Sequence, residues 1–198
     1  MKGLRKVVWA EGVFLGQQHF QLWDRYLEKY QHLRAKSLSP FNWGILSHRI
    51  DSDSLANGQY KLLACDVIFP DGRLVSYEGN ADEALSCQLD ASGDHVEVML
   101  AIPSNDSVSG IAGYQNNSRL GAWAASFDQI PDEHDPARVR EVMVGRPNLR
   151  LFQTGEPQEH FVSVKLAELV RGVDGAFALN KKFVPPVCHL EAAPAASS

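Results

Sequence analysis

The stretch VEVMLAIP, residues 96–103, decides the fold class. Branched apolar side chains occupy every second position from Val96 to Ile102, and Glu97 is among the residues between them. A period of two residues is typical of a β-strand, because successive side chains point to opposite faces of a sheet. Pro103 ends the pattern, since proline has no N–H for the hydrogen-bond ladder of a sheet. The stretch therefore predicts a β-strand.

Short apolar segments elsewhere in the chain predict further strands. The first of them leads into Pro70-Asp71-Gly72, which supplies the preset φ and the glycine that a tight turn needs, so a hairpin is expected there. Short strands separated by turn residues favour an all-β sandwich or barrel. The predicted strands are residues 60–69, 74–77, 139–144, 149–152 and 161–166.

One segment follows a different pattern and predicts a helix at about residues 17–36. Its apolar and aromatic side chains recur at steps of three and four residues, which places them along one side of a helix. Ser39-Pro40 ends it, because the residue before a proline avoids the helical region. The chain is thus predicted to be mainly β, a β-sandwich with one N-terminal amphipathic helix. The recurring residues are Phe20, Trp23, Tyr26, Leu27, Tyr30 and Leu33.

The side of this helix that carries Phe20, Trp23, Leu27 and Tyr30 has two interpretations. Amphipathic helices usually bury their apolar stripe in their own core, so we expect this side to pack on the sandwich of its own subunit. Tryptophan and tyrosine are also enriched at the centres of protein interfaces, so part of the stripe could instead face another subunit.

The segment before the helix is apolar without a helical or a clean strand period. Gly12 and Gly16 bracket an apolar tripeptide, and glycines let a backbone turn sharply or approach another chain closely. We expect this region to contact a partner protein, with Phe14 and Leu15 as anchors. An edge strand that caps the domain's own core is the open alternative. The candidate partner-binding residues are Trp9, Gly12, Val13, Phe14, Leu15, His19 and Phe20.

Composition excludes several classes of function. The 198 residues carry a net charge of −5 with a pI near 5.8, which argues against nucleic acid as a partner. No apolar run approaches the roughly 20 residues that span a bilayer. The 3 cysteines are odd in number and far apart, which is typical of reduced thiols in a cytoplasmic protein. Residues 1–190 are expected to form one domain, and residues 191–198 read as a linker.

Catalytic signatures are missing from the sequence. It contains no Gly-x-Ser-x-Gly elbow, no phosphate loop and no His-Glu-x-x-His, so no catalytic, cofactor-binding or metal-binding residue is predicted. The acidic run at residues 132–135 lacks the spacing of a calcium loop and reads as a solvated loop. The competing hypothesis is a ligand-binding or hydrolytic β-sandwich whose site is assembled from scattered residues, with His19, His48 and Asp66 as candidates.

Three groups of residues resemble the TssK family, the baseplate subunits of the bacterial type VI secretion system. The first is VWAEGVFL at residues 8–15, with QHFQ at 18–21 and DRYL at 24–27; the family usually reads WxEGMFLxPQHFQ. This chain departs from that pattern at Val13 and Gln17. The second is FPDG at residues 69–72. The third comprises NLRL at 148–151, GE at 155–156, EHF at 159–161 and FVPP at 183–186.

The resemblance implies a structural role without enzymatic activity. It implies a β-sandwich like the shoulder domain of a phage receptor-binding protein, followed by a helical neck and a head that this chain lacks. It further implies a cytoplasmic homotrimer associated with the baseplate at the inner membrane. The shoulder would attach to the wedge of TssF, TssG and TssE, and the missing head to the membrane complex of TssJ, TssL and TssM. No cofactor, nucleic acid or direct membrane insertion is implied.

Overall fold

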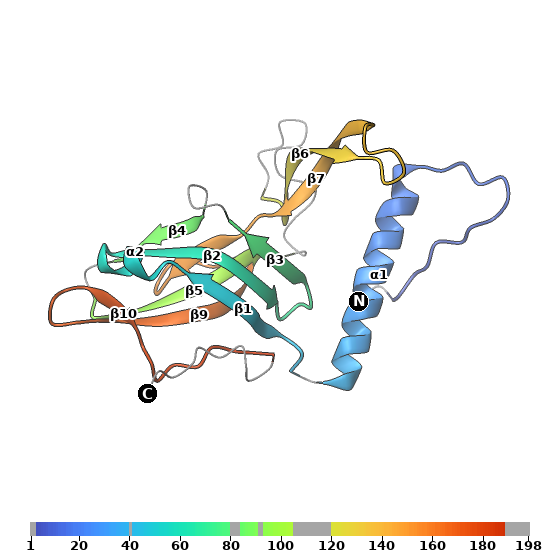
Figure 1. Ribbon diagram of the computed structural model, residues 1–198. Helices are drawn as coiled ribbons and strands as arrows, with labels where there is room; N and C mark the ends of the chain where they lie inside the picture. Colours follow the sequence, from blue (N-terminus) through green and yellow to red (C-terminus); the bar gives the residue numbers. More distant parts are fainter. Residues whose placement is uncertain (1–2, 40, 80–83, 91–92, 105–119, 189–198) are drawn as a thin grey trace.

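The computed structural model describes residues 3–39, 41–79, 84–90, 93–104 and 120–188, and it shows a β-sandwich with a long helix beside it (Figure 1). The predicted linker at residues 191–198 lies outside the described residues. The elements are α1 (Gln17–Leu38), β1 (Gly44–Ile50), α2 (Ser52–Ala56), β2 (Gln59–Ile68), β3 (Leu74–Glu78), β4 (Leu85–Gln88), β5 (His95–Pro103), β6 (Trp123–Pro131), β7 (Val139–Pro147), β8 (Arg150–Gln153), β9 (Phe161–Arg171) and β10 (Phe177–Leu179).

The sandwich consists of two four-stranded antiparallel sheets. One has the order β1-β2-β3, with β4 also paired to β2, and the other has the order β10-β9-β5-β8. The predicted strand at residues 96–103 is confirmed as β5, in the interior of the second sheet, and Val98, Leu100 and Ile102 are fully buried. They share one core with Tyr60 and Phe69 from the other sheet. The mainly β sandwich with an N-terminal helix is therefore confirmed.

Several strands lie where the sequence pattern predicted none. β1, β4, β6 and β10 were not among the predicted ranges, and β9 extends to Arg171, well beyond the predicted end at residue 166. The sequence of β6, WAASFDQIP, does not alternate, because neither face of this strand lies against the core. Periodicity detects strands that are buried on one face, so a strand outside the sandwich leaves no such signal.

The predicted turn at Pro70-Asp71-Gly72 is confirmed and forms the contact point for α1. Gly72 has φ +87° and donates its N–H to the Phe69 carbonyl at 2.8 Å. A Cβ on Gly72 would lie 1.7 Å from Nδ1 of His32, so the absence of a side chain leaves room for the α1 imidazole. Gly72 thus permits the hairpin turn through its positive φ, and it leaves the space that His32 of α1 occupies.

The helix is confirmed, but the prediction that its apolar stripe packs on its own sandwich is wrong. No residue of α1 is buried, and Phe20, Trp23, Leu27 and Tyr30 remain 39–49% exposed. The opposite side of the helix, which carries Arg25 and His32, faces the β2–β3 turn. Periodicity identifies the apolar face of a helix, but it does not show whether that face contacts its own chain or another one. No helix in the described part of the chain is both long and apolar enough to cross a membrane.

Candidate partner-binding surface

Residues 3–16, here called the N-terminal hook, extend away from the first turn of α1 (Figure 1). They contain no strand, so the edge-strand interpretation of this segment does not hold. Phe14 is 92% exposed and Leu15 is more than half exposed, whereas Val7 is buried. Exposed apolar side chains that the described part of the chain leaves uncovered are typical of a surface for protein contacts.

Two local features shape the hook. Gly12 has φ +79°, and the Val13 N–H donates to the Ala10 carbonyl at 3.3 Å, which turns the chain before the apolar tripeptide. At the start of α1 the Gly16 N–H donates to Nδ1 of His19 at 3.1 Å, so the imidazole caps the helix. His19 therefore has a structural role at this point.

The structure brings only some of the predicted binding residues together. Trp9 lies edge-on to Trp23, with ring centroids 6.0 Å apart, and 6.2 Å from the His19 ring. Trp9 therefore joins the hook to α1. Phe14 and Leu15 directly precede the helix N-cap at Gly16 and are largely exposed, and Phe20 lies on the exposed side of the helix.

The aromatic stripe of α1 (Phe20, Trp23, Leu27 and Tyr30) extends the exposed apolar surface beyond the hook. Tyr30 also stacks with Tyr26 at 6.1 Å, which orders the middle of the helix. Single exposed apolar residues are common, but a continuous row on one helix face marks a contact surface. The stripe and the hook together form the candidate partner-binding surface.

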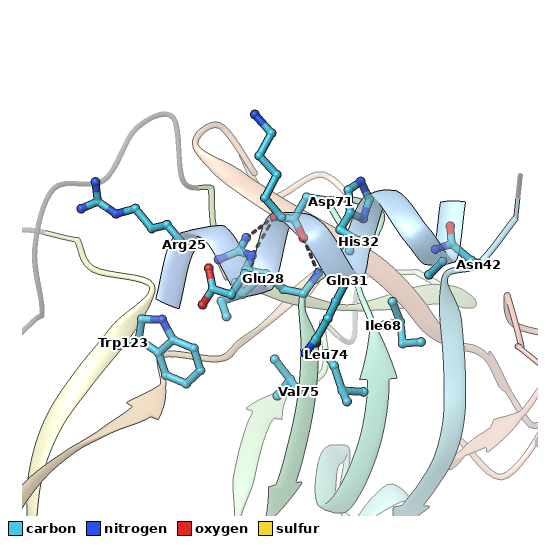
Figure 2. Close-up of a pocket in the computed structure, with 15 residues that line it drawn as sticks. Arg25, Glu28, Gln31, His32, Asn42, Ile68, Asp71, Leu74, Val75 and Trp123 are labelled. Carbon is cyan, nitrogen blue, oxygen red and sulfur yellow. Dashed lines mark hydrogen bonds and ion pairs between the residues drawn. The ribbon is translucent and has the colours of Figure 1, made fainter. Parts of the chain in front are cut away.

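The polar side of α1 explains why the stripe points outward. A cleft of about 560 Å³ separates the helix from the β2–β3 turn, and Figure 2 shows Glu28, His32 and Asp71 lining it. On the sandwich side, the Asp71 carboxylate pairs with the Arg73 guanidinium at 2.7 Å, and Arg73 Nη1 donates to the Pro103 carbonyl at 2.8 Å. Charged and polar groups thus occupy the inner side of the helix.

Burial in this cleft affects one titratable group on α1. Desolvation of the Glu28 carboxylate, reinforced by the nearby charge of Asp24, raises the pKa of Glu28. Ionising a glutamate on the inner side of the helix therefore costs more free energy than ionising it in solvent. A helix that buried its aromatic stripe instead would place Glu28 in water.

The residues of the hypothetical catalytic site do not converge. His48 lies opposite Cys65, on the core side of the sheet, and burial lowers the pKa of His48. Asp66 lies on the other side of the same sheet and accepts a hydrogen bond from Ser47 at 2.7 Å. Hydrogen bonds from serines lower the pKa of Asp66. His19 belongs to α1, so no shared site forms.

The acidic run at residues 132–135 is the tip of a hairpin formed by β6 and β7, which sequence reasoning missed. Asp132 Oδ1 accepts backbone N–H groups from His134 and Asp135, at 2.8 and 3.1 Å, so this carboxylate shapes the turn. Among the described residues, no group of three or more His, Cys, Asp or Glu side chains could hold a metal ion.

The chain is similar to known proteins of bacterial type VI secretion systems. A family model described as bacterial type VI secretion, with the names EvfL, ImpJ and VasE, matches residues 19–198. The type VI secretion system baseplate component TssK1 of Pseudomonas aeruginosa strain PAO1 is 26% identical over 202 residues. The match covers 98% of this chain and 44% of the relative, so the chain spans less than half of that protein.

Solved structures resemble the chain over almost its full length. A crystal structure of TssK has a TM-score of 0.83 at 25% identity, covering 98% of this chain and 45% of that one. A cryo-electron microscopy structure of a TssK-TssF-TssG baseplate subcomplex gives a TM-score of 0.85 at 23% identity, covering 97% of this chain and 65% of that one. At 23% identity, the similarity to the subcomplex structure shows that the two proteins share a fold.

Proposed function

The chain belongs to the TssK family of bacterial type VI secretion proteins, and on that premise we propose that it is a structural adaptor of the secretion baseplate without catalytic activity. The observation that carries the proposal is the apolar surface of the hook and the aromatic stripe, which the rest of the described chain leaves exposed. A protein that works by contact needs such a surface, whereas the residues proposed for catalysis lie apart.

The proposed partner is the wedge that contains TssF and TssG. Support comes from the TssK-TssF-TssG subcomplex, in which a protein of this fold is assembled with those two. In this chain the contact is assigned to the region from Trp9 to Phe20, which includes Gly12, Val13 and His19, with Phe14 and Leu15 as anchors. The exposure of both anchors supports the assignment. Residues 1–190 form the domain that carries the contact.

The same proposal includes self-association and a place at the inner face of the bacterial membrane. The adaptor acts as one of several copies in the cytoplasm, and it reaches TssL and TssM through parts of the full-length protein beyond this chain. The names of its relatives as baseplate components support this location.

Titration of the chain against a purified TssF–TssG complex tests the proposal. Phe14→Ala is expected to weaken binding by about 2 kcal/mol, close to thirtyfold in Kd, as for an interface anchor. Its melting temperature should stay within about a degree of the parent, because Phe14 is 92% exposed. Val173→Ala, at a fully exposed turn in the sandwich, is the matched control and should bind normally. Failure of the parent chain to bind TssF–TssG refutes the proposal.

A further inference from the structure

A cavity of about 340 Å³ opens at the end of the sandwich where α2 lies beside β10 (Figure 1). β1 and α2 line it from one sheet, β9 and β10 line it from the other, and residues 180–185 complete it. Small-molecule sites are cavities of about 300–1,000 Å³ that are largely apolar and carry a few polar groups. None of the lining residues belongs to the hook or the aromatic stripe, so the cavity lies outside the proposed surface for the wedge proteins.

The interior of the cavity is apolar and aromatic. Leu55 and Phe177 line it and are at most 6% exposed, and Phe183 adds a second ring. Arg171 lies over the Phe177 ring at 5.8 Å, and Lys165 lies over the Phe183 ring at 5.1 Å. Neither cation lines the cavity, so the side of each ring that faces the cavity is free of them. An aromatic ligand gains from edge-on or offset stacking against such rings.

The FVPP segment at residues 183–186 is held in place beside the cavity from both ends. The Pro186 carbonyl accepts the Ile45 N–H of β1 at 2.8 Å. The Phe183 N–H donates to the Asn180 carbonyl at 3.0 Å. These backbone contacts fix the wall that the segment contributes before any ligand arrives, and a preformed site binds at a lower entropic cost.

His48 supplies a hydrogen-bonding group to this apolar interior. Its imidazole lines the cavity from the core side of β1, and burial lowers the pKa of His48, so the ring is neutral near pH 7. A neutral imidazole donates one hydrogen bond and accepts another. In the described part of the chain, no side chain or backbone group forms a hydrogen bond with this ring. The imidazole is therefore available to a ligand.

The charged groups that line the cavity balance each other. Glu168 is one of them, but its carboxylate pairs with Lys165 at 2.9 Å and accepts a hydrogen bond from Asn180 Nδ2 at 3.1 Å. Lys181 and Ser52 are exposed and lie at the mouth. One anion and one cation line the cavity, so a neutral ligand fits it better than a charged one.

We propose that this cavity binds a small, neutral aromatic molecule that carries one hydroxyl group, with its ring against Phe177 and Phe183 and its hydroxyl bonded to the His48 imidazole. A hydroxyl both donates and accepts, so it pairs with an imidazole nitrogen whether or not that nitrogen carries the proton. A ligand without the hydroxyl would desolvate His48 and leave it unpaired, which costs free energy. The site is independent of the proposed adaptor function, because it uses other residues.

Titration of the isotope-labelled 198-residue chain with 2-naphthol, followed by nuclear magnetic resonance of the backbone amides, tests the proposal. This probe is neutral near pH 7 and carries a ring and one hydroxyl, and naphthalene is the matched probe without the hydroxyl. We expect a Kd on the order of 100 μM for 2-naphthol, as for a ligand of this size. The shifted amides should include those of His48, Leu55 and Phe177. Naphthalene should bind about tenfold more weakly, since it leaves the imidazole unpaired.

Two variants locate the hydrogen bond. His48→Phe removes the imidazole but keeps an aromatic ring, so it should bind 2-naphthol about tenfold more weakly than the parent and lose the preference over naphthalene. His134→Phe makes the same substitution at the exposed tip of the β6–β7 hairpin and should leave both affinities unchanged. Far-ultraviolet circular dichroism checks that both variants are folded, and the comparison of the two probes on the parent chain does not depend on either variant.

Four outcomes would overturn the proposal. They are an absence of saturable binding, equal affinity of the parent for the two probes, amide shifts confined to the aromatic stripe of α1, and a folded His48→Phe that keeps the preference. Saturating 2-naphthol should leave TssF–TssG binding unchanged, because the cavity and the hook share no residue. Displacement of TssF–TssG by the probe would instead assign the cavity to a side chain of a partner protein. Absence of TssF–TssG binding without any probe would refute the wedge proposal alone.

Discussion

The effect of Trp23→Ala on the free energy of unfolding tests whether the aromatic stripe of α1 belongs to the core. Trp23 is 44% exposed, and its recorded ring contact is the edge-on packing with Trp9 at 6.0 Å. An aromatic pair contributes about 0.5–1.5 kcal/mol beyond its buried area. The half-covered ring adds a similar amount, so we expect a loss of about 1–2 kcal/mol in the free energy of unfolding. Truncation of a fully buried aromatic costs about 3–5 kcal/mol.

Urea denaturation followed by circular dichroism measures this difference, at a protein concentration low enough for the chain to be monomeric. Phe69→Ala is the matched comparison, because Phe69 is fully buried between the two sheets. It should lose about 3–5 kcal/mol in the same assay. A Trp23→Ala loss as large as that of Phe69→Ala would show that the stripe is core after all, and the outward orientation of α1 would be wrong.

Three further predictions concern the cleft, the turn and the thiols. Burial raises the pKa of Glu28, so its proton is held more tightly in the folded state, and the stability that this proton contributes is lost as the pH rises through the folded pKa. Glu28→Gln should flatten the stability profile at pH values above the ordinary glutamate pKa of about 4.5, and it should raise stability at neutral pH by less than about 1 kcal/mol, since the side chain is partly solvated. An unchanged profile would contradict this. Gly72→Ala should lose about 2 kcal/mol or more, from its positive φ and the clash with His32, and adding His32→Ala should recover part of that loss in thermal melts. Burial raises the pKa of Cys65 to about 12 and that of Cys87 to about 11, so both should resist iodoacetamide at about pH 8 until the chain unfolds, as read by mass spectrometry.

The sandwich was predictable from the sequence wherever a strand has one face against the core. β5 and the β2–β3 hairpin carry alternation or a turn signature that depends on local backbone geometry alone. β6 carries neither, because neither of its faces lies against the core of the sandwich. The helix was predictable for the same reason as β5, since its three-and-four spacing records one apolar face.

The three-and-four spacing of apolar residues in α1 does not show in which direction the apolar face of the helix points. Exposed aromatic side chains at Trp23 and Tyr30 have the same spacing whether they contact a sheet of the same chain or the surface of another. The relative positions of the candidate binding residues could not be predicted from the sequence either. Trp9 and His19 meet at the start of α1, whereas Phe14 is largely exposed. The chain turns at Gly12 between Trp9 and Phe14, and residue spacing does not encode that turn.

The inner side of α1 nevertheless carried a signal in the sequence. Arg25, Glu28, Lys29 and His32 lie three or four residues apart, so they form a second stripe, made of charged and polar side chains. A helix must turn one side toward the domain to which it is tethered, and here the β2–β3 turn offers the Asp71–Arg73 ion pair and a glycine. Polar groups on the helix face polar groups on the turn, and the cost of desolvation in the cleft falls on Glu28, whose pKa is raised. The aromatic stripe is thereby left facing outward, and no described residue of the chain buries it.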